Sequence, residues 1–112
     1  MEILDRLYAV IRERARERPS GSYVVSLLDA GPDAIASKLR EECEELVEAA
    51  AEADDAHTVH EVADLIFHVW VLLGALELPP ERVYAELEKR FGTGGLEEKA
   101  ARGTRQRGDT GC

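Results

Sequence analysis

The stretches KLREECEELVEAA (residues 38–50) and HEVADLIFHVW (residues 60–70) decide how this chain folds. Apolar side chains recur in both at the spacing of a helix, so each stretch predicts a helix that buries one face. The second stretch interrupts its apolar run with Glu61, Asp64 and His68. The first concentrates like charge in a few turns, with Glu41, Glu42, Glu44, Glu45 and Glu48. Like charges four residues apart destabilise a helix, so this pattern needs a partner of opposite charge.

The helix predicted from about Ala56 to Leu76 is apolar on nearly every side, which is typical of a buried helix. Its polar residues recur at i, i+4, i+7 and i+11 and form one narrow stripe, made of His57, Glu61, Asp64 and His68. A carboxylate buried alone is very costly, so these groups must be ion-paired, protonated or bound to a metal ion. Lys38 is the one obvious cation on the neighbouring helix and cannot neutralise all of the carboxylates. The charge deficit therefore predicts divalent cations.

The helix predicted from a cap at Asp33 to about Ala53 carries its carboxylates on a definite arc. At about 100° per residue, the residues expected to face the core are Ile35, Leu39, Cys43, Leu46 and Ala50. An adjoining arc carries Lys38, Glu41, Glu42 and Glu45. A simple solvated acidic face is the alternative interpretation, but it leaves repulsive pairs such as Glu41 and Glu45 with few basic partners.

The ligand types predict which metal ion is bound. Ligation by oxygen alone selects hard ions, Mg²⁺ or Mn²⁺, over zinc. A di-iron bundle uses Glu-x-x-His on each of two helices, whereas here Glu61 is followed three residues later by Asp64. We expect His68 to be a hydrogen-bonded core histidine, and His57 and His60 to lie at the surface near the start of their helix.

The rest of the chain predicts further helices and no strand, so the fold class is all-α, with four to five helices. The further helices that we expect are an amphipathic helix at residues 3–17, a helical turn at residues 24–28 and a last helix that begins with Pro79 and Pro80. Asp54 or Asp55 is expected to cap the helix that follows it. We expect one all-α domain over residues 1–92 and a Gly- and Arg-rich tail, partly mobile, over residues 93–112.

Composition and charge exclude several classes of protein. A chain of 112 residues that is 45% hydrophobic and 33% charged predicts a soluble globular domain. A net charge of −9 and a pI near 4.8 argue against nonspecific binding to nucleic acid or an anionic membrane. The chain has no uninterrupted apolar run of about 18 residues and no signal-peptide pattern, so we expect a cytoplasmic protein. Cys43 and Cys112 are expected to be a small core residue and a tail thiol.

The spacing Glu41-Glu42-x-x-Glu45, then fifteen residues, then Glu61-x-x-Asp64 resembles the signature of the MazG-like all-α nucleoside triphosphate pyrophosphohydrolases. Four stretches narrow the resemblance to the phosphoribosyl-ATP pyrophosphohydrolase family over about residues 21–102: GSYVVSLLDAG, KLREECEELVEAA, EVADLIFHVWVLL and ELEKRFGTGGLEEKAAR. The resemblance implies Mg²⁺-dependent hydrolysis of phosphoribosyl-ATP to phosphoribosyl-AMP and pyrophosphate, the second step of histidine biosynthesis, with Mn²⁺ as an alternative ion. It also implies a helical bundle completed by homodimerisation, in the stand-alone form rather than fused to the cyclohydrolase that acts next.

The same resemblance implies roles for individual carboxylates. Glu42, Glu45, Glu61 and Asp64 match the metal-binding positions of the family. Glu41 matches the first acid of the motif and is our candidate for orienting or deprotonating the attacking water. These roles suit the chemistry, because a metal ion neutralises polyphosphate charge and acidifies water, and a carboxylate can accept the proton.

The residues that the resemblance places near the substrate each have a structural alternative. Lys38 could meet a phosphate oxygen or form a salt bridge with a neighbouring glutamate. Ser22 and Tyr23 could touch the substrate or anchor their loop. Lys99 and Arg102 could order on the second phosphate group of the ligand or remain in a solvated tail.

Two rival functions stay open. A house-cleaning hydrolase of other nucleoside triphosphates would keep the same carboxylates but need not keep the GSY stretch or the GLEEKAAR tail. A non-catalytic helical scaffold would leave the polar stripe unexplained. Departures from the family pattern at Val24, Arg40 and Glu44 remove no expected metal ligand.

Overall fold

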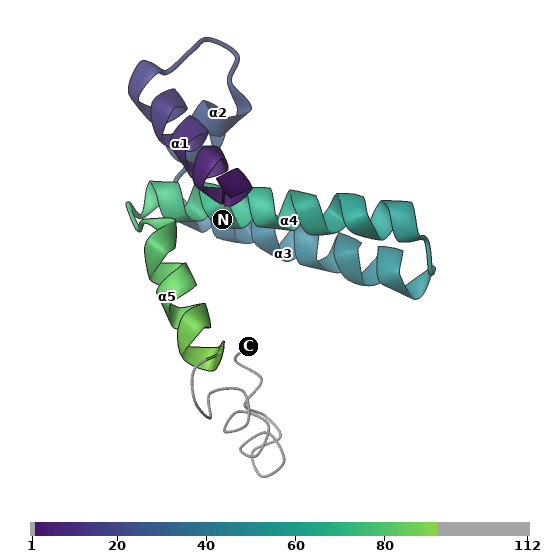
Figure 1. Ribbon diagram of the computed structural model, residues 1–112. Coiled ribbons are helices and arrows are strands. Elements are labelled where there is room, and N and C mark those ends of the chain that lie inside the picture. The colour runs from purple at the N-terminus through teal and green to yellow at the C-terminus, as the bar shows by residue number, and fades with distance from the viewer. Residues whose placement is uncertain (1, 92–112) are drawn as a thin grey trace. The chain divides into compact units, whose positions relative to one another are not determined.

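The computed structural model describes residues 2–91, which form five helices and no strand. The helices are α1 (Glu2–Glu17), α2 (Tyr23–Ala30), α3 (Pro32–Ala51), α4 (Asp55–Ala75) and α5 (Pro80–Phe91). The expected all-α fold class is therefore confirmed. The chain divides into two compact units, one ending at Pro80 and one beginning at Glu81 (Figure 1). The tail predicted for residues 93–112 lies outside the described residues.

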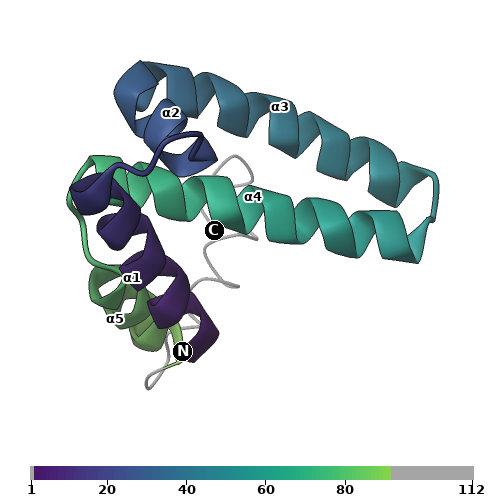
Figure 2. The ribbon, with the colours of Figure 1, turned by 90° about the horizontal axis from the view of Figure 1, so that it is seen from above.

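Helices α3 and α4 lie side by side and antiparallel in the first unit (Figures 1 and 2). Helix α3 ends in a Schellman motif, in which the backbone N–H groups of Ala53 and Asp54 donate to carbonyls of its last turn. The Asp54 side chain then caps α4 by accepting a hydrogen bond of 3.1 Å from the backbone N–H of His57. The predicted cap is confirmed, and a connection this short fixes the register of the two helices.

The buried stripe of α3 differs from the predicted one. Ile35, Glu42 and Ala49 are its buried residues, and they are spaced seven residues apart. Residues spaced seven apart stay on the side of a helix that faces a neighbouring helix. The residues of the predicted arc turn gradually away from that side along α3. Cys43 and Ala50, which were expected in the core, are consequently exposed. Glu42 therefore lies within the buried stripe and not merely beside it.

Helices α1 and α2 pack against the α3–α4 pair (Figure 2). The Trp70 Nε1–H donates to the carbonyl of Leu4 at 3.0 Å, and Arg12 Nη1 donates to the carbonyl of Gly74 at 3.2 Å. A Cβ atom on the buried Gly74 would lie only 2.9 Å from Cγ2 of Ile11. Glycine at this position thus allows α1 and α4 to approach closely.

The segment predicted as a helical turn forms a helix of 8 residues, α2. The side chain of Ser22 caps this helix, because its Oγ accepts a hydrogen bond of 3.2 Å from the backbone N–H of Val25. Helix α3 begins at Pro32 after Gly31, whose φ of 95° favours glycine. The prediction that Asp33 caps α3 is wrong, since Asp33 lies in the first turn, where its charge complements the helix dipole.

Helix α4 is less buried than its composition predicts. Val59 is 68% exposed, Val62 is 40% exposed and Ile66 is 36% exposed. Within residues 2–91, α4 is also the single helix whose length and mean hydropathy of 1.3 suit a membrane span. This is weak evidence for a membrane, because the core helix of a soluble protein meets the same criteria.

The second unit contains most of α5. The helix opens with Pro80 followed by Glu81, as predicted, and carries Lys89 and Arg90 in its last turn. Proline at the first position and charges of these signs at the two ends all favour a helix.

The left-handed backbone of Ala53 gives a test of the α3–α4 connection. Its φ of 58° is unfavourable for a residue with a Cβ atom. We expect Ala53→Gly to raise the free energy of unfolding by about 0.5–1 kcal/mol. In Ala51→Gly, the same change inside the last helical turn should lower it by about 1 kcal/mol. Urea denaturation measures both, and changes of the same sign would contradict the described turn.

Candidate metal centre

Carboxylates from α3 and α4 converge on one place between the two helices. Glu42, Glu45 and Glu61 each offer an oxygen that lies within 4.8 Å of the others. Glu42, Asp64 and His68 form a second set that meets the same limit. Because Glu42 belongs to both sets, all of the predicted metal ligands meet in one carboxylate cluster, which consists of Glu42, Glu45, Glu61 and Asp64.

The two most buried carboxylates of the cluster each have an oxygen without a partner. Glu42 is 3% exposed and Glu61 is 5% exposed. Glu42 Oε2 and Glu61 Oε1 make no hydrogen bond with any residue that the structure describes. Leaving such an acceptor buried and unsatisfied costs about 1–3 kcal/mol, and more when it is charged. Oxygen ligands of this kind fit a hard divalent cation.

The environment of Glu42 disfavours its charged form. Burial raises the pKa of the Glu42 carboxyl above its ordinary value of 4.5. The neighbouring carboxyl of Asp64 and the negative charge of Glu45 raise the pKa further, and His68 opposes them. Glu42 therefore retains its proton at pH values where a solvated glutamate is ionised, and a cation that bound to this carboxylate would have to displace the proton.

His57 borders the cluster from the solvent side. The residue lies at the surface, as expected, with 45% of its side chain exposed. Its Nε2 nevertheless lies 3.1 Å from Glu61 Oε2. Sequence reasoning missed this contact, although the i, i+4 spacing of the two residues on one helix was a signal that could have revealed it.

His68 borders the cluster from the inside. The side chain is 2% exposed, and the expectation of a hydrogen-bonded core histidine is confirmed. Its Nδ1 lies 2.8 Å from the carbonyl oxygen of Asp64 and 3.8 Å from Glu42 Oε1. Its Nε2 lies 2.9 Å from the hydroxyl oxygen of Tyr23. Tyr23 stands 45 residues earlier in the chain, so no local pattern could have predicted this bond.

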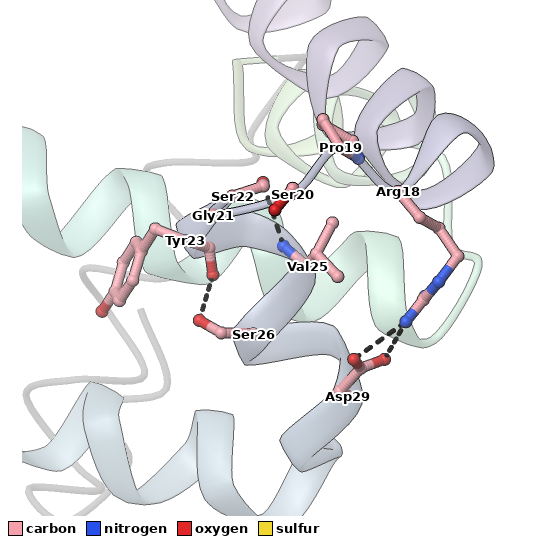
Figure 3. A pocket seen from close by; sticks show the side chains of 9 residues that line it. All are labelled: Arg18, Pro19, Ser20, Gly21, Ser22, Tyr23, Val25, Ser26 and Asp29. Carbon is pink, nitrogen blue, oxygen red and sulfur yellow. Dashed lines mark hydrogen bonds and ion pairs between the residues drawn. The ribbon is translucent and has the colours of Figure 1, made fainter.

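Ser22 and Tyr23 line a surface pocket of about 550 Å³, formed by residues 18–23 and by α2 (Figure 3). At one end of the pocket, Arg18 Nη2 lies 2.8 Å from each carboxylate oxygen of Asp29. The Tyr23 ring points away from this ion pair (Figure 3). The two residues expected to meet the substrate thus also have structural roles, as a helix cap and as the partner of His68. Their contact with substrate stays a prediction.

Glu41 and Lys38 lie beside the cluster. The Glu41 side chain is 60% exposed, and its Oε1 lies 3.6 Å from Lys38 Nζ. Tyr23 raises the pKa of Lys38, and Glu41 and Glu42 raise it further, although burial opposes them. Lys38 therefore keeps its positive charge at neutral pH. Lys99 and Arg102, which were expected near the substrate, lie outside the described residues.

The substitution Glu42→Gln tests whether the cluster stores repulsion in the absence of metal. At pH 7.5 in EDTA we expect the melting temperature to rise by about 4–8 °C, corresponding to roughly 1 kcal/mol. The amide removes the buried charge and can donate to a neighbouring carboxylate. Added Mg²⁺ should stabilise the parent protein but have little effect on the variant. Differential scanning fluorimetry measures both shifts.

The difference in stability between Glu42→Gln and the parent protein should depend on pH with a definite sign. Because the Glu42 pKa is raised, the folded chain binds more protons than the unfolded chain above pH 4.5, and the parent loses stability as the pH rises. The advantage of Glu42→Gln should therefore disappear at about pH 4, where the parent glutamate is protonated in both states. Glu44→Gln, a change at an exposed position two residues away, is the matched control and should have no effect. Equal shifts in the two variants would contradict a buried repulsive cluster.

Comparison with known proteins shows what the chain is similar to. A family model described as phosphoribosyl-ATP pyrophosphohydrolase matches residues 4–91. A phosphoribosyl-ATP pyrophosphatase of Rhodopirellula baltica is 50% identical over 102 residues, which cover 88% of this chain and 85% of the relative. Proteins of the same name from Trichlorobacter lovleyi and Geobacter metallireducens are 47% and 48% identical, covering 89% and 90% of this chain and 93% of each relative.

Proposed function

Because the chain belongs to the phosphoribosyl-ATP pyrophosphohydrolase family, we propose that it hydrolyses phosphoribosyl-ATP to phosphoribosyl-AMP and pyrophosphate, with Mg²⁺ as cofactor and Mn²⁺ as an alternative ion. This reaction is the second step of histidine biosynthesis. The name that the relatives share and their coverage of nearly the whole chain support the substrate.

One observation supports the proposed dependence of the activity on a metal ion. Glu42 and Glu61 are almost fully buried, come from different helices, and each has an oxygen without a partner among residues 2–91. A protein gains nothing in stability from such an arrangement, so a ligand that satisfies both oxygens is its simplest explanation. Glu45 and Asp64 complete an oxygen-rich set around them.

In the proposed mechanism, Glu42, Glu45, Glu61 and Asp64 would hold the cation. A bound Mg²⁺ supplies charge neutralisation for the polyphosphate and acidifies water. Glu41 precedes Glu42 in the chain and its side chain is 60% exposed, so its carboxylate is accessible to accept the proton of the attacking water. The water oxygen bonds to the first phosphorus of the triphosphate, and the anhydride bond to the second phosphorus breaks.

Lys38 has a defined part in this mechanism. Its ammonium group pairs with Glu41 at 3.6 Å, and 35% of the Lys38 side chain is exposed. An incoming phosphate oxygen can therefore compete with Glu41 for the ammonium group. Loss of this partner would leave Glu41 available to accept a proton. Substrate binding and activation of the base are thus linked through one lysine.

Pyrophosphate release tests the proposed reaction directly. We expect Mg²⁺-dependent release from phosphoribosyl-ATP and not from ATP or dCTP. Glu45→Gln should lower kcat by at least about 100-fold, because the cation supplies several kcal/mol of charge stabilisation. Glu48→Gln, a change at an exposed position on the same helix, is the control and should leave the rate unchanged. Faster turnover of ATP or dCTP would instead assign a house-cleaning hydrolase.

We propose that the active form is a homodimer whose second copy covers the exposed apolar face of α4. Val59, Val62 and Ile66 recur at i, i+3 and i+7 and are 68%, 40% and 36% exposed. Val47 on α3 is 67% exposed. Apolar side chains that stay exposed along one face of a helix are candidates for an interaction site. We also propose a cytoplasmic location without nucleic-acid or membrane partners, which the net charge of −9 supports.

Paired substitutions test this interface. The double variant Val62→Gln and Ile66→Gln should shift the protein from dimer to monomer in sedimentation velocity, because it removes apolar area from the contact. Val10→Gln with Ile3→Gln changes the same residue types on α1, where the side chains are 41% and 67% exposed. This second variant should remain dimeric. A parent protein that sediments as a monomer at micromolar concentration would refute the dimer.

A further inference from the structure

Both ring nitrogens of the buried His68 are engaged. Nδ1 lies 2.8 Å from the backbone carbonyl of Asp64, which can only accept, so Nδ1 must carry a hydrogen atom. Nε2 lies 2.9 Å from the hydroxyl of Tyr23. In the neutral ring, Nε2 accepts the hydrogen bond from that hydroxyl. In the protonated ring, Nε2 has no lone pair at all. In either state the imidazole has no free lone pair for a metal ion.

His68 nevertheless lies against the carboxylate cluster. Its Nδ1 is 3.8 Å from Glu42 Oε1, whereas the other oxygen of that carboxylate, Oε2, has no hydrogen-bond partner among the described residues. The two oxygens of Glu42 are thus distinguished by the imidazole. Oε1 is the oxygen in contact with the ring, at a distance longer than a hydrogen bond, and Oε2 is the oxygen without a partner among the described residues. Groups that orient a metal ligand in this way commonly determine the affinity of the site.

Aromatic packing holds the imidazole in this orientation. Tyr23 stacks on Phe67 with ring centroids 6.0 Å apart and an interplanar angle of 14°. Phe67 and Tyr23 each meet the His68 ring edge to face, at 5.1 Å and 5.8 Å. Such pairs contribute about 0.5–1.5 kcal/mol beyond the area they bury. The ring therefore has little freedom to turn toward the cluster and become a ligand.

We propose that Tyr23 and His68 are a positioning pair for metal binding: the Tyr23 hydroxyl fixes the His68 imidazole, and the imidazole orients Glu42 and the adjoining turn of α4 at Asp64. The inference rests on the proposed function, because it concerns the same carboxylate cluster. It assigns Tyr23 to the metal centre even if the residue never touches the substrate.

Binding of Mn²⁺ in the absence of nucleotide tests the pair. We expect Tyr23→Phe to weaken Mn²⁺ binding about tenfold, as measured by electron paramagnetic resonance of the free ion. Tyr8→Phe removes the same hydroxyl from a half-buried tyrosine of α1 and should leave the affinity unchanged. His68→Asn retains an N–H donor for the Asp64 carbonyl and should bind Mn²⁺ more tightly than His68→Ala. Adding Tyr23→Phe to His68→Ala should weaken binding no further, because both act through one contact.

The ¹⁵N spectrum of the imidazole gives a readout that does not require metal. In the metal-free parent, His68 should show a hydrogen on Nδ1, and its Nε2 signal should shift in Tyr23→Phe. If Tyr23→Phe leaves both the Mn²⁺ affinity and the ¹⁵N signals unchanged and raises only the KM for phosphoribosyl-ATP, Tyr23 is a substrate contact and the positioning role is wrong. If the parent itself fails to bind Mn²⁺ while the ¹⁵N signals behave as expected, the metal-dependent function fails, and the hydrogen-bonded pair is only structural.

Discussion

The structure depends on one costly feature, the burial of Glu42 and Glu61 between α3 and α4 with an unsatisfied oxygen on each. Carboxylates at these positions weaken the helix pair that forms the centre of the first unit, because buried charge without a partner opposes folding. The same burial raises the pKa of Glu42, so that its carboxyl keeps a proton to higher pH than a solvated glutamate does. The divalent cation that we propose would remove both costs, and its binding would then be coupled to the stability of the fold.

Other contacts in the first unit offset this cost and position the side chains of the carboxylate cluster. The tight connection at Ala53 and Asp54 sets the register that brings α3 and α4 carboxylates together. Trp70 ties α4 to α1 through its hydrogen bond with the carbonyl of Leu4. Through its bond to His68, Tyr23 connects the pocket beside α2 with the carboxylates. Neighbouring groups thus hold the carboxylates in place, an arrangement that would favour tight and specific binding of the proposed cation.

Sequence alone predicts the helices and the convergence of the carboxylates more readily than the exact packing of the helices. The polar stripe on α4 and the acidic run on α3 both have helical spacing, so the convergence of Glu61 with the glutamates of α3 follows from two helices that pack together. A helical wheel wrongly places Cys43 on the buried face of α3, because the wheel does not include the seven-residue register imposed by a partner helix. The bond between Tyr23 and His68 depends on tertiary structure, and no local spacing contains it.

The most direct test of the account is the anomalous scattering of Mn²⁺ in crystals of the protein grown with the ion. The account predicts a peak within coordination distance of both Glu42 Oε2 and Glu61 Oε1, the two oxygens that lack partners among residues 2–91. It also predicts that His68 keeps its contacts with Tyr23 and the Asp64 carbonyl and does not bind the ion. A peak held by exposed carboxylates alone, with Glu42 and Glu61 unchanged, would contradict the central claim.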